Sequence, residues 1–292
     1  MPPTEEQPSS LLEGMEIRNW SRMSAELMFI YDDEIDAQYL WHRQHLDDYA
    51  AILIREGRCT IEGEEGRVEA LAGEWVLPRG RNRFQVFTPG SRILSIHFLL
   101  SWPGGMPVYD WNSTLVIPSA EVPELEERGK RLETVIANET PGGGRRLRHS
   151  RSSLFGYLHI YRHFYQWLET FGQVLASRGV GPIPQGKIDP RLLKVVQLLD
   201  RHPFHVPLSQ AELAAQVNLS TNQLTRLFKG QFRMTPAAYF DQRRGREAFT
   251  RVQSSRDAFK EIAYDLGFSS PSHFSTWFAK CFRHSPSEIR GY

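Results

Sequence analysis

The sequence predicts a protein of two domains: an all-β domain followed by a helical hairpin, and then an all-α domain. Three observations lead to this fold class. Short apolar runs separated by Gly or Pro dominate the first hundred residues, whereas apolar residues follow a helical spacing from Glu121 onward. The charge also changes along the chain, because residues 1–187 contain 20 Lys and Arg against 25 Asp and Glu, while residues 188–292 contain 15 against 9. A length of 292 residues agrees with two domains.

The all-β domain is expected over residues 15–110. Its apolar or alternating runs are YAAILIREG, RCTIEG, GRVEALAGEWVLPRG, RFQVFTPG and RILSIHFLL. Gly or Pro punctuates each run, and none of them has a helical period of useful length. Several short strands at this spacing are typical of a small sandwich or barrel.

Residues 111–176 are expected to form the helical hairpin. Its stronger apolar stripe runs from Leu154 to Leu175 in steps of three and four, which makes a face about 30 Å long. Two explanations of this face remain open: it packs on the chain's own β domain, or it pairs with a second copy in a homodimer. The residues assigned to dimerisation are Leu154, Leu158, Tyr161, Leu168 and Leu175.

Residues 177–187, SRGVGPIPQGK, have no periodicity and contain three Gly and two Pro, so they are interpreted as an interdomain linker. The all-α domain is expected over residues 188–292, and its net charge of +6 favours a polyanionic partner. Asp189 and Pro190 open its first helix. Ser209, Ser220 and Asp257 are the predicted caps of later helices.

This all-α domain contains an internal duplication. LAAQVNLS (213–220) matches IAYDLGFS (262–269), and LFKGQFRMTP (227–236) matches WFAKCFRHSP (277–286). The two copies have nearly the same internal spacing and are joined by a predicted helix over 236–252. A single helix-turn-helix pattern is weak evidence, because any helical hairpin can mimic it. Two copies in a basic domain predict two helix-turn-helix units.

The segments LTRLFK, TPAAYF, IAYDLGFSSPSHFSTWF and SPSEIR resemble the AraC/XylS family of transcriptional regulators, over about residues 192–290. The resemblance implies a cytoplasmic regulator, an activator or a repressor, that binds an operator in double-stranded DNA as a homodimer. It also implies a cupin-like N-terminal domain that binds a small-molecule effector, a sugar or another small metabolite. The chain departs from the family pattern at Arg233 and Arg283, where Gly is usual, and at Gly245 and Ala279.

The second helix of each unit is predicted to enter a major groove, where short polar side chains allow a close approach and Arg or Gln reach the bases. Arg226 suits guanine, and Gln223 or Asn222 suits adenine. The first predicted DNA-contacting set is Thr221, Asn222, Gln223, Thr225, Arg226 and Lys229. The second set is Ser270, Pro271, Ser272, His273, Thr276 and Lys280.

The predicted effector-binding residues of the β domain are His42, His45, Trp75, Arg83 and His97. Strand alternation places Ile93, Ser95, His97 and Leu99 on one face, and a lone His on such a face is more often a core residue than a ligand contact. No metal is expected, because Asn82 and Arg83 stand where metal-binding cupins carry a later His. No cofactor is expected either.

No catalytic motif is evident, so the chain is predicted not to be an enzyme. Two alternatives are kept: a cupin-type enzyme fused to a DNA-binding domain, and an architectural DNA-binding protein. Cys59 and Cys281 make no disulfide framework, which is in keeping with a reducing cytoplasm. The acidic start MPPTEEQPSSLLEG lacks the apolar stretch of a secretory signal, and no membrane span is expected.

Overall fold

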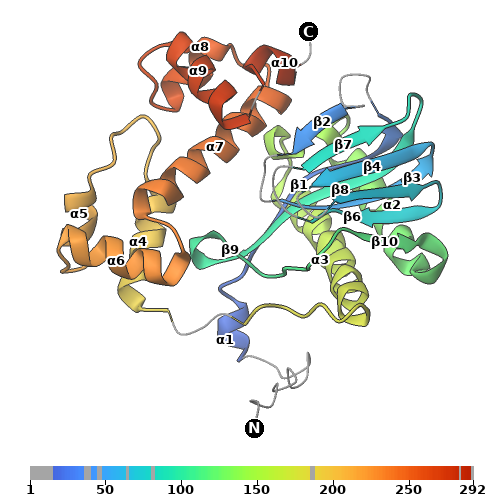
Figure 1. Cartoon of the computed structure of the whole chain (residues 1–292), viewed down its shortest axis with the longest axis horizontal. Helices are drawn as coiled ribbons and strands as arrows, with labels where there is room; N and C mark the ends of the chain where they lie inside the picture. The colour runs from blue at the N-terminus through green and yellow to red at the C-terminus, as the bar shows by residue number, and fades with distance from the viewer. Residues whose placement is uncertain are drawn as a thin grey trace. The chain divides into compact units, whose positions relative to one another are not determined.

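The chain forms two units that are described here one at a time (Figure 1). The N-terminal unit comprises Met1–Leu100 and Pro107–Pro184, and the C-terminal unit comprises Ser101–Met106 and Gln185–Tyr292. The computed structural model describes residues 16–35, 41–44, 48–63, 66–79, 83–184, 188–282 and 284–290. Within these ranges, none of the helices has the length and hydropathy needed to cross a bilayer.

The N-terminal unit is built on two sheets that share one core. The six strands of the first sheet are β1 (Ser24–Glu34), β8 (Arg92–Trp102), β3 (Tyr49–Glu56), β6 (Glu74–Leu77) and β10 (Leu115–Pro118) in that order, with β9 (Met106–Pro107) beside β8. The second sheet has the order β2 (Trp41–Gln44), β7 (Arg83–Phe87), β4 (Arg58–Gly63) and β5 (Gly66–Leu71).

The shared core lies between the two sheets. Ile52 and Ile93 of the first sheet are clustered there with Cys59, Ile61 and Phe87 of the second. The predicted all-β domain is therefore confirmed. No hydrogen-bonded path joins the two sheets within the described strands, so this part of the chain is a sandwich rather than a closed barrel.

Two long helices, α2 (Pro123–Glu139) and α3 (Leu154–Ser177), pack against each other and against the outer face of the first sheet. A side chain at Gly129 of α2 would lie 3.2 Å from Leu94 and Ile96 of β8. The Phe98 ring meets the Trp167 and Phe171 rings of α3 at centroid distances of 5.3 and 5.1 Å. Short helical segments complete the unit: α1 (Ile17–Trp20), η3 (Ser119–Glu121) and η4 (Gly144–His149).

The C-terminal unit is helical, as predicted. Its helices are α4 (Pro190–Arg201), α5 (Gln210–Ala215), α6 (Thr221–Phe232), α7 (Pro236–Ser254), α8 (Phe259–Asp265), α9 (Pro271–Phe282) and α10 (Pro286–Arg290). The side chains of Asp189, Ser209 and Ser220 accept hydrogen bonds from the first turns of α4, α5 and α6. The one-turn segment η2 (Pro103–Gly105) also belongs to this unit, and the adjoining Met106 packs on the core formed by α4–α7.

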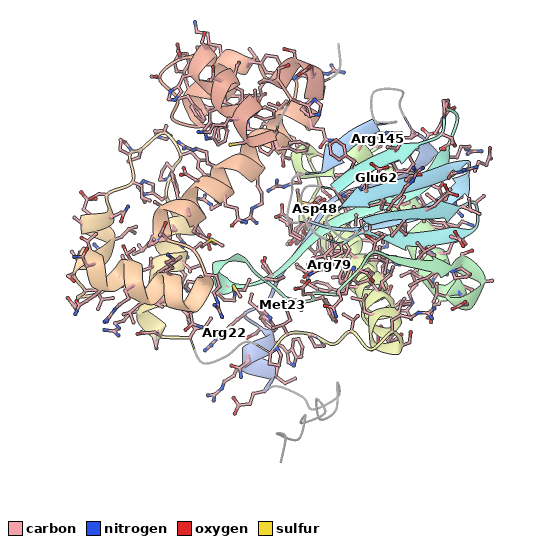
Figure 2. The ribbon with its side chains drawn as sticks, viewed as in Figure 1. Arg22, Met23, Asp48, Glu62, Arg79 and Arg145 are labelled. Atoms are coloured by element: carbon pink, nitrogen blue, oxygen red, sulfur yellow. The ribbon has the colours of Figure 1, made fainter. Side chains whose placement is uncertain are left out.

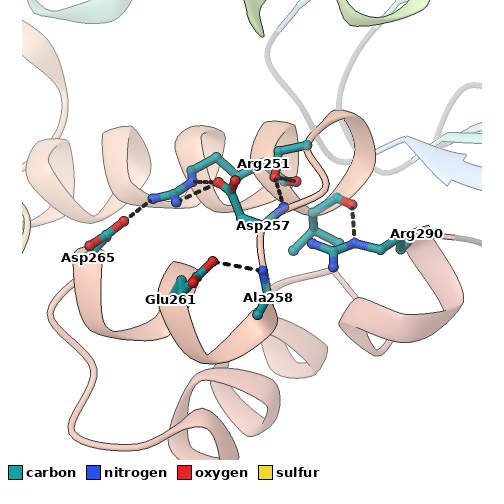
Figure 3. Close-up of polar contacts among 8 residues, drawn as sticks. Arg251, Asp257, Ala258, Glu261, Asp265 and Arg290 are labelled. Atoms are coloured by element: carbon teal, nitrogen blue, oxygen red, sulfur yellow. Dashed lines mark hydrogen bonds and ion pairs between the residues drawn. The ribbon is translucent and has the colours of Figure 1, made fainter.

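The predicted cap at Asp257 is wrong. Helix α8 starts at Phe259 after Ala258, whose methyl side chain cannot accept a hydrogen bond, and Glu261 accepts the Ala258 N–H instead at 3.1 Å (Figure 3). The Asp257 carboxylate binds the Arg251 guanidinium at 2.7 and 3.1 Å, and Asp265 accepts from the same group at 2.9 Å. Arg251 thereby ties the end of α7 to α8.

Arg233, which stands where the resembled family usually has Gly, ends α6 in the left-handed conformation, with a φ of 61°. Its equivalent, Arg283, lies outside the described residues. Gly245 sits inside α7 without interrupting the helix, and a side chain added there would lie 3.7 Å from the Phe282 ring.

Replacing Arg233 by Gly should stabilise the protein by about 0.5–1 kcal/mol, because Gly adopts a positive φ without the steric cost that a β-carbon imposes. Urea unfolding followed by circular dichroism measures the change. Arg233→Ala is the matched control, since it removes the same exposed side chain but keeps the β-carbon. If the alanine variant is stabilised as much as the glycine variant, backbone strain is not the cause.

Candidate nucleic-acid interface

Each half of the C-terminal unit contains two helices joined by a left-handed turn. In the first half the turn residue between α5 and α6 is Asn218, with a φ of 53°, and in the second half it is Gly267, with a φ of 79°. The residue after each turn donates its N–H to a carbonyl five positions earlier, Leu219 to Ala214 at 3.0 Å and Phe268 to Ala263 at 2.9 Å. The duplication found in the sequence is thus repeated in backbone geometry.

The second helix of each half buries one apolar face and exposes a polar one. Leu224, Phe228 and Phe232 of α6 are at most 1% exposed, and the equivalent phenylalanines of α9 are at most 5% exposed. On the other face of α6, Asn222, Gln223, Arg226 and Lys229 are exposed, with Thr221 and Thr225 half-buried. On α9 the exposed residues are Ser272, His273, Thr276 and Lys280, with Ser270 and Pro271 half-buried.

Two of the predicted DNA-contacting residues have other bonds in this structure. The Gln223 side-chain oxygen accepts from the Ser220 N–H at 3.0 Å and from its hydroxyl at 3.1 Å, which forms a capping box at the start of α6. His273 lies 3.3 Å from the Ser269 hydroxyl through Nδ1, while its N–H donates to the Ser270 hydroxyl at 3.1 Å. Gln223 therefore has its amide oxygen committed to the helix terminus.

Helix α7 is shared by the two halves. Tyr239 and Phe240 at its start belong to the buried cluster of α4–α6, whereas the Phe249 ring meets Phe278 and Phe282 of α9 at 6.5 and 5.2 Å. At the far end of α7, Arg290 donates to the Val252 carbonyl at 3.2 Å (Figure 3). One continuous helix thus carries both halves.

A second group of polar residues lies inside the β-sandwich. The Asp48 carboxylate, labelled in Figure 2, is hydrogen-bonded to His97 Nδ1 at 2.6 Å. Both side chains are less than a tenth exposed. The Phe29 ring stacks on His97 at 4.2 Å. Arg83 and Gln85 of β7 are each 1% exposed, and burial lowers the pKa of Arg83 while the nearby Asp48 raises it.

The described side chains among the five predicted effector-binding residues do not all lie on the same face of the sheet. Arg83 and His97 lie in the sandwich interior, where Asp48 and Gln85 join them without having been predicted. Trp75 is next to Val76, which lies in the shared core, so strand alternation directs Trp75 to the opposite face of the sheet. His42 pairs with Gln85 along β2 and β7, and nothing is described of its side chain; His45 lies outside the described residues. No set of three His, Cys, Asp or Glu side chains in the described part of the chain is arranged to hold a metal.

The C-terminal third of the chain is similar to known proteins. A family model described as a helix-turn-helix domain matches residues 213–292. The transcriptional activator RhaS of Pectobacterium atrosepticum is 41% identical over 78 residues, and RhaS of Klebsiella pneumoniae is 35% identical over 102 residues. An AraC-type transcriptional regulator from Chromobacterium violaceum is 33% identical over 35% of this chain and 89% of that one, with a TM-score of 0.32.

The chain belongs to the AraC/XylS family. The resemblance found in the sequence is confirmed, and the matched RhaS relatives are transcription activators. The matches cover 28% and 36% of the two RhaS proteins, so the chain matches about a third of the length of these curated relatives.

The architecture of the whole chain also has a counterpart. A single-residue variant of ToxT from Vibrio cholerae, in its apo form, has a TM-score of 0.51 at 13% identity, over 92% of this chain and 96% of that one. Wild-type ToxT with an unsaturated fatty acid bound has a TM-score of 0.50 at 12% identity. At such identities the likeness shows a shared fold, which combines an N-terminal β domain with AraC/XylS helix-turn-helix units.

Proposed function

We propose that the protein is a transcription activator of the AraC/XylS family that binds duplex DNA through α6 and α9. The observation that carries the proposal is the duplicated helix-turn-helix. In each copy the second helix buries a face that contains phenylalanines and exposes small polar or basic side chains. The net charge of +6 over residues 188–292 supports a polyanionic partner. Activation follows the RhaS relatives, and free Cys59 and Cys281 suit the reducing cytoplasm in which such a regulator would act.

The two helices divide the work of recognition unequally. Arg226 and Lys229 give α6 two exposed cations. Asn222 adds an exposed amide that makes no side-chain hydrogen bond within the described residues. Helix α9 offers hydroxyls, His273 and Lys280, which suit phosphates and sugars more than base edges. We therefore expect most of the direct base readout from α6.

Replacing Arg226 by Ala should weaken binding to a site selected from random duplexes by about 1–3 kcal/mol and relax the base preference at one position. Fluorescence anisotropy across single-base variants measures both effects. Thr276→Ala, at the equivalent position of α9, should cost less than Arg226→Ala. Lys229→Ala should weaken all sequences alike and reduce the salt dependence by about one ion. An Arg226→Ala protein that still discriminates like the wild type would refute the assignment of α6.

We also propose that the start of α3 pairs with a second copy. Ten large hydrophobic side chains are exposed in the described part of the chain, and five of them fall between residues 154 and 165. Leu154, Leu158 and Tyr165 are 68%, 51% and 51% exposed, and with half-buried Tyr161 they follow steps of four, three and four. Such spacing makes a continuous helical stripe suited to another helix. Leu175 is fully buried in its own unit and Leu168 is half-buried, so the proposed interface is the N-terminal half of α3.

Replacing Leu158 by Glu should shift the protein from dimer to monomer, because the carboxylate would have to be desolvated in an apolar interface. Sedimentation velocity at micromolar concentration measures the shift, and binding to a two-half-site operator should weaken because linked half-sites lose their effective concentration. Gln173→Glu, an exposed change on the same helix, is the control and should remain dimeric. A wild-type protein that sediments as a monomer contradicts the proposal.

A small-molecule effector is proposed to bind beside the polar group in the sandwich. Buried polar side chains are costly unless they are bonded, and Gln85 Nε2 has no hydrogen-bond partner in the described structure. Together Gln85 and Arg83 supply donors, Asp48 supplies an acceptor and the Phe29 ring supplies an apolar wall. This combination suits a polyhydroxylated molecule such as a sugar, or a metabolite of similar chemistry.

Gln85→Leu should leave the protein at least as stable as the wild type, because it removes a buried amide donor that lacks a partner. The same variant should bind the effector about tenfold more weakly or worse, since the lost hydrogen bond is worth roughly 1.5 kcal/mol. Urea unfolding tests the stability of the variant. Calorimetric titration with a panel of sugars, with and without operator DNA, tests its affinity, and an active sugar and the DNA must alter each other's affinity by the same factor. Equal affinity of the variant and the wild type for an active sugar would exclude Gln85 from the site.

A further inference from the structure

The left-handed turns of the two halves are equivalent, but only the second one uses glycine. Asn218 shows that this turn can be made by a residue with a β-carbon, because Asn enters the left-handed region at little cost. The conformation alone therefore does not explain why residue 267 is Gly. Another feature of the surroundings must distinguish Gly267 from Asn218.

That feature is a loop of the first half. A β-carbon at residue 267 would lie 2.4 Å from the carbonyl oxygen of Phe204 and 3.3 Å from Cα of His205, well inside contact distance. The loop that connects α4 to α5 thus packs its main chain directly on the turn of the second half. The contact is backbone to backbone, so a rotamer change cannot relieve an added side chain.

Hydrogen bonds within the first half and from α7 hold the loop in place. His202 Nε2 lies 3.0 Å from the Val206 carbonyl, and Val206 donates its N–H to Pro203 at 3.2 Å. Arg243 of α7 donates to the carbonyls of Leu199 and His202 at 2.5 and 3.2 Å.

The Arg243 guanidinium also lies 4.4 Å from the Phe204 ring centroid. That ring meets Phe240 of α7 at a centroid distance of 5.5 Å. The loop is therefore fastened to α7 by hydrogen bonds and by a cation–π contact.

The next residue of α7 holds the other half. The Arg244 guanidinium lies 4.9 Å from the Phe268 ring and 5.4 Å from the Trp277 ring, and it pairs with Asp241 at 2.7 Å. Phe268 is the residue immediately after Gly267 and is 4% exposed. Of two consecutive arginines of α7, Arg243 thus contacts the loop of the first half and Arg244 contacts the second half. We call this contact region the seam and define it as Phe204, Arg243, Arg244 and Gly267.

We infer that this seam sets the orientation of α9 relative to α6, and thereby determines which spacing between two DNA segments the protein accepts. Helix α7 has Gly245 at its centre. If α7 were the sole connection between the two halves, nothing would prevent the helix from bending at that glycine. A second attachment beside the helix removes that freedom. The inference rests on the proposed DNA-binding function for its consequence, but the structural role of the seam is measurable without DNA.

Gly267→Asn tests the seam, and Asn218→Gly is its matched control. Asn keeps the left-handed turn accessible, so the variant differs chiefly by the β-carbon that meets the Phe204 carbonyl. The first measurement is DNA-free, on the full-length chain with spin labels on Cys281 and on Lys229→Cys. Cys59 should stay unlabelled, because it is fully buried and burial raises the pKa of its thiol to about 12, although nearby Arg83 lowers it.

Dilution with unlabelled protein restricts the measured distance to one chain. We expect a single narrow distance distribution for the wild type and for Asn218→Gly, and a shifted or broadened one for Gly267→Asn. If Gly267→Asn does not fold, Arg244→Met takes its place, because it frees the Phe268 side of the seam without adding a clash. A distribution that superimposes on the wild type in the folded variant overturns the inference.

The second measurement uses selected duplexes in which one base pair is inserted between the two contacted segments. The wild type and Asn218→Gly should lose at least about tenfold in affinity, whereas Gly267→Asn should lose no more than about threefold from its own optimum. If the wild type does not bind duplex DNA at all, the proposed function fails while the distance measurement still decides the seam. Equal spacing discrimination by all three proteins contradicts the inference.

Discussion

The C-terminal unit depends on the sharing of helix α7 between two small cores. Its start contributes Tyr239 and Phe240 to one core, and Phe249 and Val252 are buried farther along it. The helices α5 and α8 have six and seven residues, which is too short for stable helices in isolation. Each helix-turn-helix half therefore acquires its stability only when α7 completes its core. The same sharing makes the two halves one object, because displacing α7 disturbs both.

Local patterns in the sequence were sufficient for most of this unit. The apolar period of α6 and α9 reports burial because a helix repeats its faces every three to four residues, and Ser209 and Ser220 cap because their partners lie within the next turn. Asp257 failed as a cap because a tertiary partner, Arg251, competes for its carboxylate. The loop that packs on Gly267 is about sixty residues away in the chain, so no local pattern could reveal it.

The N-terminal unit was harder to predict because sheets are assembled from distant strands. Alternation along β8 directed His97 to the same face as Ile93, and Ile93 does lie in the sandwich core. The alternation of one strand says nothing about the others, however. Trp75 faces the opposite side of the sheet from His97. The hydrogen-bond partner of His97 is Asp48, which lies just before β3. Whether two sheets close into a barrel is likewise set by pairing at their edges, which has no signature within a single strand.

The chain passes between the two units at more places than the predicted linker at 177–187. Strand β8 carries His97 in the N-terminal unit and then continues to Trp102, which belongs to the C-terminal unit, before the chain returns at Pro107. A ligand can change the behaviour of a distant part of a protein only by the difference in its affinity for two states. A ligand beside His97 would act on a strand whose own continuation, through Met106, packs on the core of the first helix-turn-helix half.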